Sequence, residues 1–133
     1  MSASQYRGQL ERKRKQRIEA EKKAGEYRTK ESKKRAEAAK ARQSASKTKS
    51  ETTAKSKLRE ADRKDQEAEA AGKEAGRLQS KAAGYSKEES ALLTKLTRAE
   101  QSEADAAERR RKREQQQADR RIAADRATLE SRI

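Results

Sequence analysis

The sequence has no Cys, His, Pro, Asn, Val, Phe or Trp among its 133 residues. Without Cys and His it has no disulfides, no thiol chemistry and none of the usual transition-metal ligands. The apolar residues are 25 Ala, seven Leu, three Ile, three Tyr and one Met, which is too little bulk to bury a globular core. The most apolar run, ALLTKL at residues 91–96, is far too short to cross a membrane.

What the sequence does contain is helix-forming residues. Ala, Leu, Glu, Lys, Arg, Gln and Met make up 98 of the 133 positions. High charge with few aromatics is also typical of disorder, but abundant Ala, alternating charge and the absence of Pro favour long helices. We therefore predict an all-α fold, a long antiparallel helical hairpin or coiled coil, in which residues from about 100 to 133 project as a C-terminal helical stalk.

Charge is distributed unevenly along the chain, whose net charge is +14. Residues 1–57 carry 19 basic and 7 acidic side chains, residues 58–108 carry 9 and 12, and residues 109–133 carry 9 and 4. A strongly basic arm is thus followed by a mildly acidic arm and a basic tail. If the two arms lie against each other, their opposite charge balance favours the contact.

Small apolar residues recur at spacings of three and four in both arms, which is the pattern of packed helices. The charged residues Lys13, Arg17, Glu31 and Lys34 interrupt the first seam, and Glu89 interrupts the second. The first seam consists of Tyr6, Leu10, Ala20, Ala24, Tyr27, Ala38, Ala41 and Ala45, and the second of Ala71, Ala75, Leu78, Ala82, Tyr85, Leu92, Leu96 and Ala99.

The Ser- and Thr-rich stretch RQSASKTKSETTAKSKL, residues 42–58, predicts a chain reversal. We expect one helical module over 1–133, with a helix over 5–46, a turn at 47–51 and a helix over 52–133. Thr48 and Glu51 have the spacing of a capping box for the second helix. Facing residues should then have numbers that sum to 98 or 99, which places Ala41 against Leu58. A parallel dimer of unbent helices uses the same seams, but its +12 arms would repel each other.

Glycines mark a second candidate break near residues 84–86. Gly84 can end one helix, and Ser86 with Glu89 can cap the next. Alternatively, Gly72, Gly76 and Gly84 let two backbones approach closely along an Ala-lined seam. We favour the close approach, because the apolar seam keeps its phase across residue 84.

Two basic clusters raise the question of nucleic acid. The denser cluster, ERRRKREQQQADRR at 108–121, can contact phosphates through Arg109, Arg110, Arg111, Lys112 and Arg113. The other, LERKRKQRIEAEKK at 10–23, is partly neutralised by its own acids. Stacking aromatics and a zipper are missing, so the sequence favours solvated charge over a nucleic-acid-binding protein and keeps the latter as the alternative function.

No residue pattern predicts catalysis or a small-molecule site. Carboxylate pairs such as Glu88 with Glu89 lie on helix expected to be exposed, where nothing raises a pKa or excludes water. The glycines match no phosphate-binding loop. We therefore expect no enzyme, no catalytic residues, no cofactor, no metal, no small-molecule ligand and no membrane partner. The N-terminus MSASQYRGQLERKRK is followed by no apolar segment, so it predicts no secretory signal and a cytoplasmic location.

Three stretches together resemble the helical N-terminal leaders of actinobacterial multidomain proteins. They are KKAGEYRTKESKKRAEAAKA, SETTAKSKLREADRKDQEAEAAGKEAGRLQSKAAGY and ERRRKREQQQADRR. In that group an Ala- and charge-rich coiled coil precedes a toll/interleukin-1-receptor-like or caspase-like effector domain. The resemblance implies an assembly role in bacterial defence signalling, and no catalytic residue carries over. The uncapped C-terminal pattern ADRRIAADRATLESRI also leads us to expect that the natural protein continues.

The sequence as a whole predicts a non-catalytic oligomerisation scaffold that clusters and presents a downstream domain. Its partner is expected to be another copy of the chain or a partner helix. Ile122, Leu129 and Ile133 form the expected partner-helix face. The packing positions expected in the hairpin are Tyr6, Leu10, Tyr27, Leu58, Leu78, Tyr85, Leu92 and Leu96.

Overall fold

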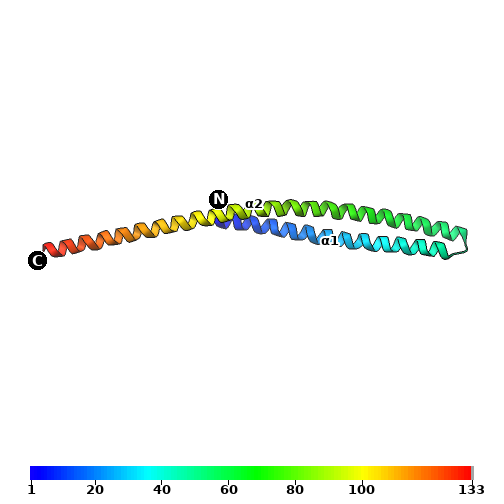
Figure 1. Cartoon of the computed structure of the whole chain (residues 1–133), viewed down its shortest axis with the longest axis horizontal. Helices are drawn as coiled ribbons and strands as arrows, with labels where there is room; N and C mark the ends of the chain where they lie inside the picture. The colour runs from blue at the N-terminus through cyan, green and yellow to red at the C-terminus, as the bar shows by residue number, and fades with distance from the viewer. Residues whose placement is uncertain (133) are drawn as a thin grey trace. The chain divides into compact units, whose positions relative to one another are not determined.

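The computed structural model describes residues 1–132 and confirms the all-α helical hairpin. It contains two helices, α1 (Ala3–Lys47) and α2 (Glu51–Ser131), and no strand among the described residues. The contacts divide the chain into two units, which we call the hairpin unit (Leu10–Ser90) and the terminal unit (Met1–Gln9 with Ala91–Ile133). In the hairpin unit, α1 and α2 lie side by side and antiparallel (Figure 1).

Polar side chains define the helix starts. Ser50 caps α2, because its Oγ accepts a hydrogen bond from the Thr53 amide at 3.3 Å. Thr48 Oγ1 accepts from the Ser50 amide at 3.3 Å, so Thr48 orders the turn and the capping box expected from it is wrong. In the terminal unit, Ser2 and Gln5 form a reciprocal capping box at the start of α1.

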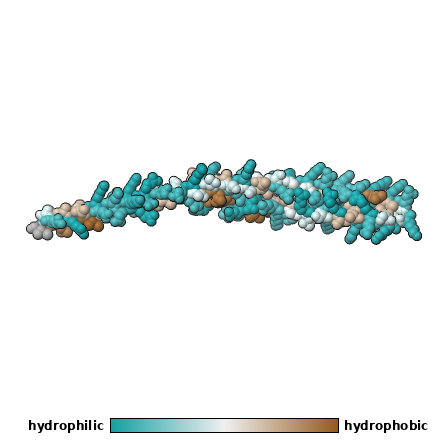
Figure 2. All heavy atoms as spheres, in the orientation of Figure 1, coloured by the Kyte–Doolittle hydropathy of each residue, from teal (hydrophilic) through white to brown (hydrophobic). Residues whose placement is uncertain are grey.

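Alanine makes up most of the buried interface of the hairpin unit. Ala38, Ala41 and Ala61 form a buried cluster near the turn. The charged residues that interrupt the sequence pattern occupy seam positions and are half-buried there. Hydrophilic residues cover most of the visible surface, with scattered apolar patches (Figure 2). The buried residues of the hairpin unit are Leu10, Ala20, Ala24, Ala38, Ala41, Ala45, Ala61, Ala68, Ala71, Ala75, Leu78 and Ala82.

The register of the hairpin differs from the expected one. Ala38 does meet Ala61, as predicted. However, Lys34 pairs with Glu67, a number sum of 101, and Arg17 pairs with Glu89, a number sum of 106. Leu58 is 47% exposed, so the prediction that it packs in the hairpin is wrong. The seam passes through the neighbouring Lys57 and through Ala61, and a residue one step from Lys57 is turned about 100° away from it.

The glycines of α2 neither break the helix nor bring two backbones together. α2 is continuous through Gly84. A Cβ added at Gly76 or Gly84 would meet nothing within 4 Å, so the predicted close approach is wrong at both positions. At Gly72 an added Cβ would collide with the Glu31 carboxylate, which is a side chain and not backbone.

Replacing the unhindered glycines should therefore stabilise the helix. We expect Gly76→Ala and Gly84→Ala each to raise the free energy of unfolding by about 0.4–1 kcal/mol, because alanine loses less backbone entropy on folding. Gly72→Ala should gain clearly less, since it must displace Glu31. Urea denaturation followed by circular dichroism measures the difference. Equal stabilisation by Gly72→Ala and Gly76→Ala would contradict the packing at Gly72.

Candidate functional site

A closed ring of four charges joins α1 and α2 in the half of the hairpin unit nearer the turn. Lys34 and Glu67 lie 3.0 Å apart, and Glu37 and Lys64 lie 3.1 Å apart, both across the two helices. Within each helix, Lys34 also lies 3.9 Å from Glu37, and Lys64 lies 4.0 Å from Glu67. Their side chains are between 22% and 42% exposed. These four charged side chains fill the interface between neighbouring alanine contacts, where no large apolar side chain is present.

The ring shifts the ionisation of its members in favour of the charged forms. The Lys64 ammonium group, 3.1 Å away, lowers the pKa of Glu37, and the Lys34 ammonium group lowers the pKa of Glu67 in the same way. The Glu67 carboxylate in turn raises the pKa of Lys34. A general acid at neutral pH needs a raised carboxyl pKa, so these carboxylates are set up for ion pairing and not for proton transfer.

A second cross-helix cluster lies nearer the open end of the hairpin unit. Arg17 Nε donates to Glu89 Oε1 at 2.6 Å, and this bond raises the pKa of Arg17. Lys13 pairs with Glu88 at 2.9 Å and lies 5.7 Å from the centre of the Tyr85 ring. Tyr85 is half-buried beside them, at the position where the sequence predicts packing.

Cross-helix pairing follows the charge difference between the arms. In the hairpin unit, six of the seven ion pairs that join the helices use a base of α1 and an acid of α2. Near the turn, Arg42 pairs with Asp62 and Asp65, and Arg35 also reaches Asp65. The basic first arm is thus matched to the acidic second arm along the hairpin unit.

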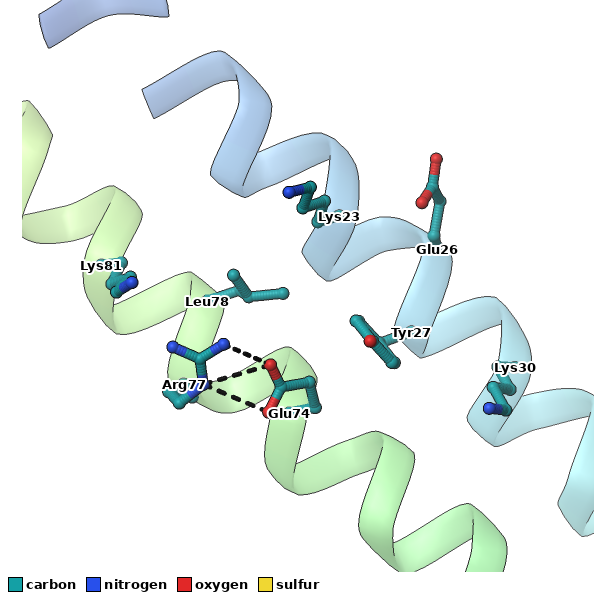
Figure 3. Close-up of a pocket in the computed structure, with 8 residues that line it drawn as sticks. All are labelled: Lys23, Glu26, Tyr27, Lys30, Glu74, Arg77, Leu78 and Lys81. Carbon is teal, nitrogen blue, oxygen red and sulfur yellow. Dashed lines mark hydrogen bonds and ion pairs between the residues drawn. The ribbon is translucent and has the colours of Figure 1, made fainter. Parts of the chain in front are cut away.

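An open groove between the helices is a candidate ligand site in the hairpin unit. Tyr27 from α1 points toward Leu78 from α2, and Glu74 is held by Arg77 (Figure 3). That pair lowers the pKa of Glu74 and raises the pKa of Arg77. The remaining lining residues Lys23, Glu26, Lys30 and Lys81 are exposed, and none of the eight lining residues is a nucleophile beside a base.

The predicted packing residues fall into three groups. Leu10, Leu78 and Leu96 are buried. Tyr6, Tyr27, Tyr85 and Leu92 are half-buried. Leu58, Ile122 and Leu129 are exposed, and Ile133 lies outside the described residues.

The terminal unit contains the predicted phosphate contacts. Ala3 N donates to Glu103 Oε1 at 3.0 Å, and Arg7 lies 3.8 Å from Glu100, so the first residues of α1 contact α2 there. From residue 108 to residue 132 every residue is exposed. Of the predicted cations Arg109, Arg110, Arg111, Lys112 and Arg113, only Lys112 has an acid within 4.0 Å among the described residues, Glu108 at 3.5 Å.

No protein family, no curated protein and no solved structure matches the chain. Over residues 1–132, no helix has the length and hydrophobicity to cross a bilayer. Within the same range, no three acidic side chains gather where they could hold a metal ion.

Charge reversal in the ring should destabilise the hairpin, and a second reversal should restore part of its stability. Lys34→Glu places a carboxylate between Glu37 and Glu67, so we expect the Tm to fall by several degrees. Adding Glu67→Lys rebuilds the cross-helix pair and should recover part of the loss, because positions 34 and 37, and 64 and 67, then carry like charges within each helix. Lys40→Glu, at an exposed α1 position with no ion pair among the described residues, makes the same charge change as a control. Thermal melts of the parent and the three variants give the Tm values. An equal fall in Tm for Lys40→Glu would contradict a specific contribution of the ring to stability.

Stability should also depend on pH at the two extremes. Since the pKa values of Glu37 and Glu67 are lowered from 4.5, their contribution is present above pH 4.5 and is lost as pH falls through the lower folded values. Since the pKa of Lys34 is raised from 10.5, its contribution is present below pH 10.5 and is lost above it. With no His in the sequence, the Tm should be flat between about pH 6 and 9.

The pH profile has an internal control in the double variant Glu37→Gln with Glu67→Gln. This variant cannot lose the ring by protonation, so its Tm should fall less than that of the parent between pH 6 and pH 3. Circular dichroism melts in matched ionic strength give both curves. If the Tm of parent and variant fell equally between pH 6 and pH 3, protonation of the ring would not be the cause of the loss of stability in acid.

Proposed function

We propose that this chain is a non-catalytic, cytoplasmic helical module that assembles copies of itself. The observation that carries the proposal is a pair of exposed large aliphatic side chains that share one face of α2 in the terminal unit. Ile122 is 54% exposed and Leu129 is 61% exposed, seven residues apart and therefore on the same face of α2. The hairpin seam is already filled by its own two helices, so these residues supply a separate surface for association.

The charge around this pair suits a second copy in antiparallel orientation. Residues 119–132 carry four bases and three acids, so two copies repel each other little there. The denser basic run Arg109–Arg113 lies outside this stretch. An antiparallel pairing centred between Ile122 and Leu129 holds the two basic runs at opposite ends.

Association raises the local concentration of whatever is fused to the assembled copies. If the resemblance to actinobacterial leaders holds, the fused part is a signalling or defence effector domain. That resemblance stays a prediction.

Removing the two aliphatic residues should prevent self-association. We expect the 15.0 kDa parent chain to show a concentration-dependent increase in mass, and Ile122→Ser with Leu129→Ser to remain monomeric. Helicity of the hairpin unit should be unchanged, because both residues are exposed. The matched control is Ile18→Ser with Leu93→Ser, at positions 52% and 54% exposed. Sedimentation equilibrium provides the masses; a monomeric parent, or a variant that associates as the parent does, would contradict the proposal.

A further inference from the structure

A second surface of the terminal unit is cationic and lies on α2 beyond its contact with α1. Arg109, Arg113 and Arg120 fall at helical spacings of four and seven residues, and therefore lie in one row. Arg110 and Arg121 lie in the adjacent row. We call these five residues the arginine face, and all of them are exposed. None has an acid within 4.0 Å among residues 1–132.

The side chains between these arginines are compatible with an anionic ligand. Gln116 lies in the row of Arg109, and Gln117 lies in the row of Arg110, so both add hydrogen-bond donors. Glu114 is the one acid in these two rows. From residue 109 to residue 121 the rows extend about 18 Å along the helix, at a rise of about 1.5 Å per residue.

The same face continues the seam by which α2 contacts α1 in the terminal unit. Leu96, Ala99, Glu103 and Ala106 follow the three–four spacing of that seam, and Glu103 makes the contact with Ala3. The next in-phase positions are Arg110, Arg113, Gln117 and Arg120. A partner helix on this face would bury no apolar side chain at these positions, so helix packing cannot hold it there.

We infer that the arginine face binds the phosphate backbone of a nucleic acid duplex. Long guanidinium side chains on an exposed helix match phosphate oxygens, and a duplex has a high charge density, about one phosphate per 1.7 Å of axis. Residues 108–132 contain no aromatic side chain, so the face offers single strands no base stacking. The contact is therefore electrostatic and independent of base sequence. It does not depend on self-association through Ile122 and Leu129.

The arginine face includes only part of the basic run Arg109–Arg113. Arg111 lies toward the side of Ile122 and Leu129, and Lys112 is paired with Glu108. Arg120 and Arg121, which the sequence analysis does not name, fall on the face because they are 11 residues from Arg109 and Arg110.

The test is fluorescence anisotropy of a labelled 20-base-pair mixed-sequence DNA duplex with the full 133-residue chain, between about 50 and 200 mM KCl. Neutralising about five phosphates predicts a slope of log Kobs against log salt near −4.5. The face variant is Arg109→Gln with Arg113→Gln and Arg120→Gln, and glutamine keeps the helix propensity. Its slope should be shallower by about 2.7, with affinity at 100 mM KCl at least about tenfold weaker.

The matched control is Arg12→Gln with Arg14→Gln and Arg59→Gln, which removes the same charge from exposed positions of the hairpin unit. It should bind within about threefold of the parent and keep its slope, since binding to the face is local. If the control and the face variant lost affinity for the duplex equally, the loss would be explained by net charge alone, and the inference would be wrong. It would also be overturned by absence of binding at 50 mM KCl, or by tighter binding of a labelled polyglutamate peptide than of the duplex, which would favour an acidic protein partner.

Discussion

The hairpin depends on the match between a basic helix and an acidic one across an alanine contact. Alanine side chains contribute little burial each, so the close contact of α1 and α2 in the hairpin unit cannot rest on apolar area alone. Cross-helix ion pairs from Lys13 to Arg42 lie along that contact, nearly all with the base on α1. Each pair is partly exposed and individually weak, and together they also select one alignment of the helices.

The separate roles of the alanine contact and of the ion pairs explain what could be predicted from the sequence. The absence of Pro, the seams and the Ser- and Thr-rich stretch were enough to predict two helices with a turn near residue 49. They were not enough for the register, because one alanine pairs with another about equally well at each step along a heptad pattern. The side chains that distinguish the steps are Lys34, Glu67 and Arg17, and a pattern search counts these as interruptions. Leu58 was misplaced for the same reason.

The candidate surfaces were only partly predictable. Exposure of Ile122 and Leu129 follows from their place beyond the contact with α1, and the sequence did single them out as a partner face. The arginine face needed the structure, because the run Arg109–Arg113 alone goes round the helix. Helical spacing aligns Arg120 and Arg121 with Arg109 and Arg110, and the structure adds that these residues are exposed and have no acid within 4.0 Å among residues 1–132. The seam of the hairpin unit is filled by its own side chains, and the two surfaces proposed for partners lie in the terminal unit.

A distance measurement between the two helices tests the hairpin itself. The chain has no Cys, so the double variant Lys23→Cys with Lys81→Cys takes one spin label at each introduced cysteine. Both positions are exposed and line one groove. With the labelled chain diluted into unlabelled chain, pulsed dipolar spectroscopy should show a separation below about 3 nm, because packed helices lie about 1 nm apart. A separation near 9 nm, the span of 58 residues in one unbent helix, or a short distance that disappears on dilution, would contradict it.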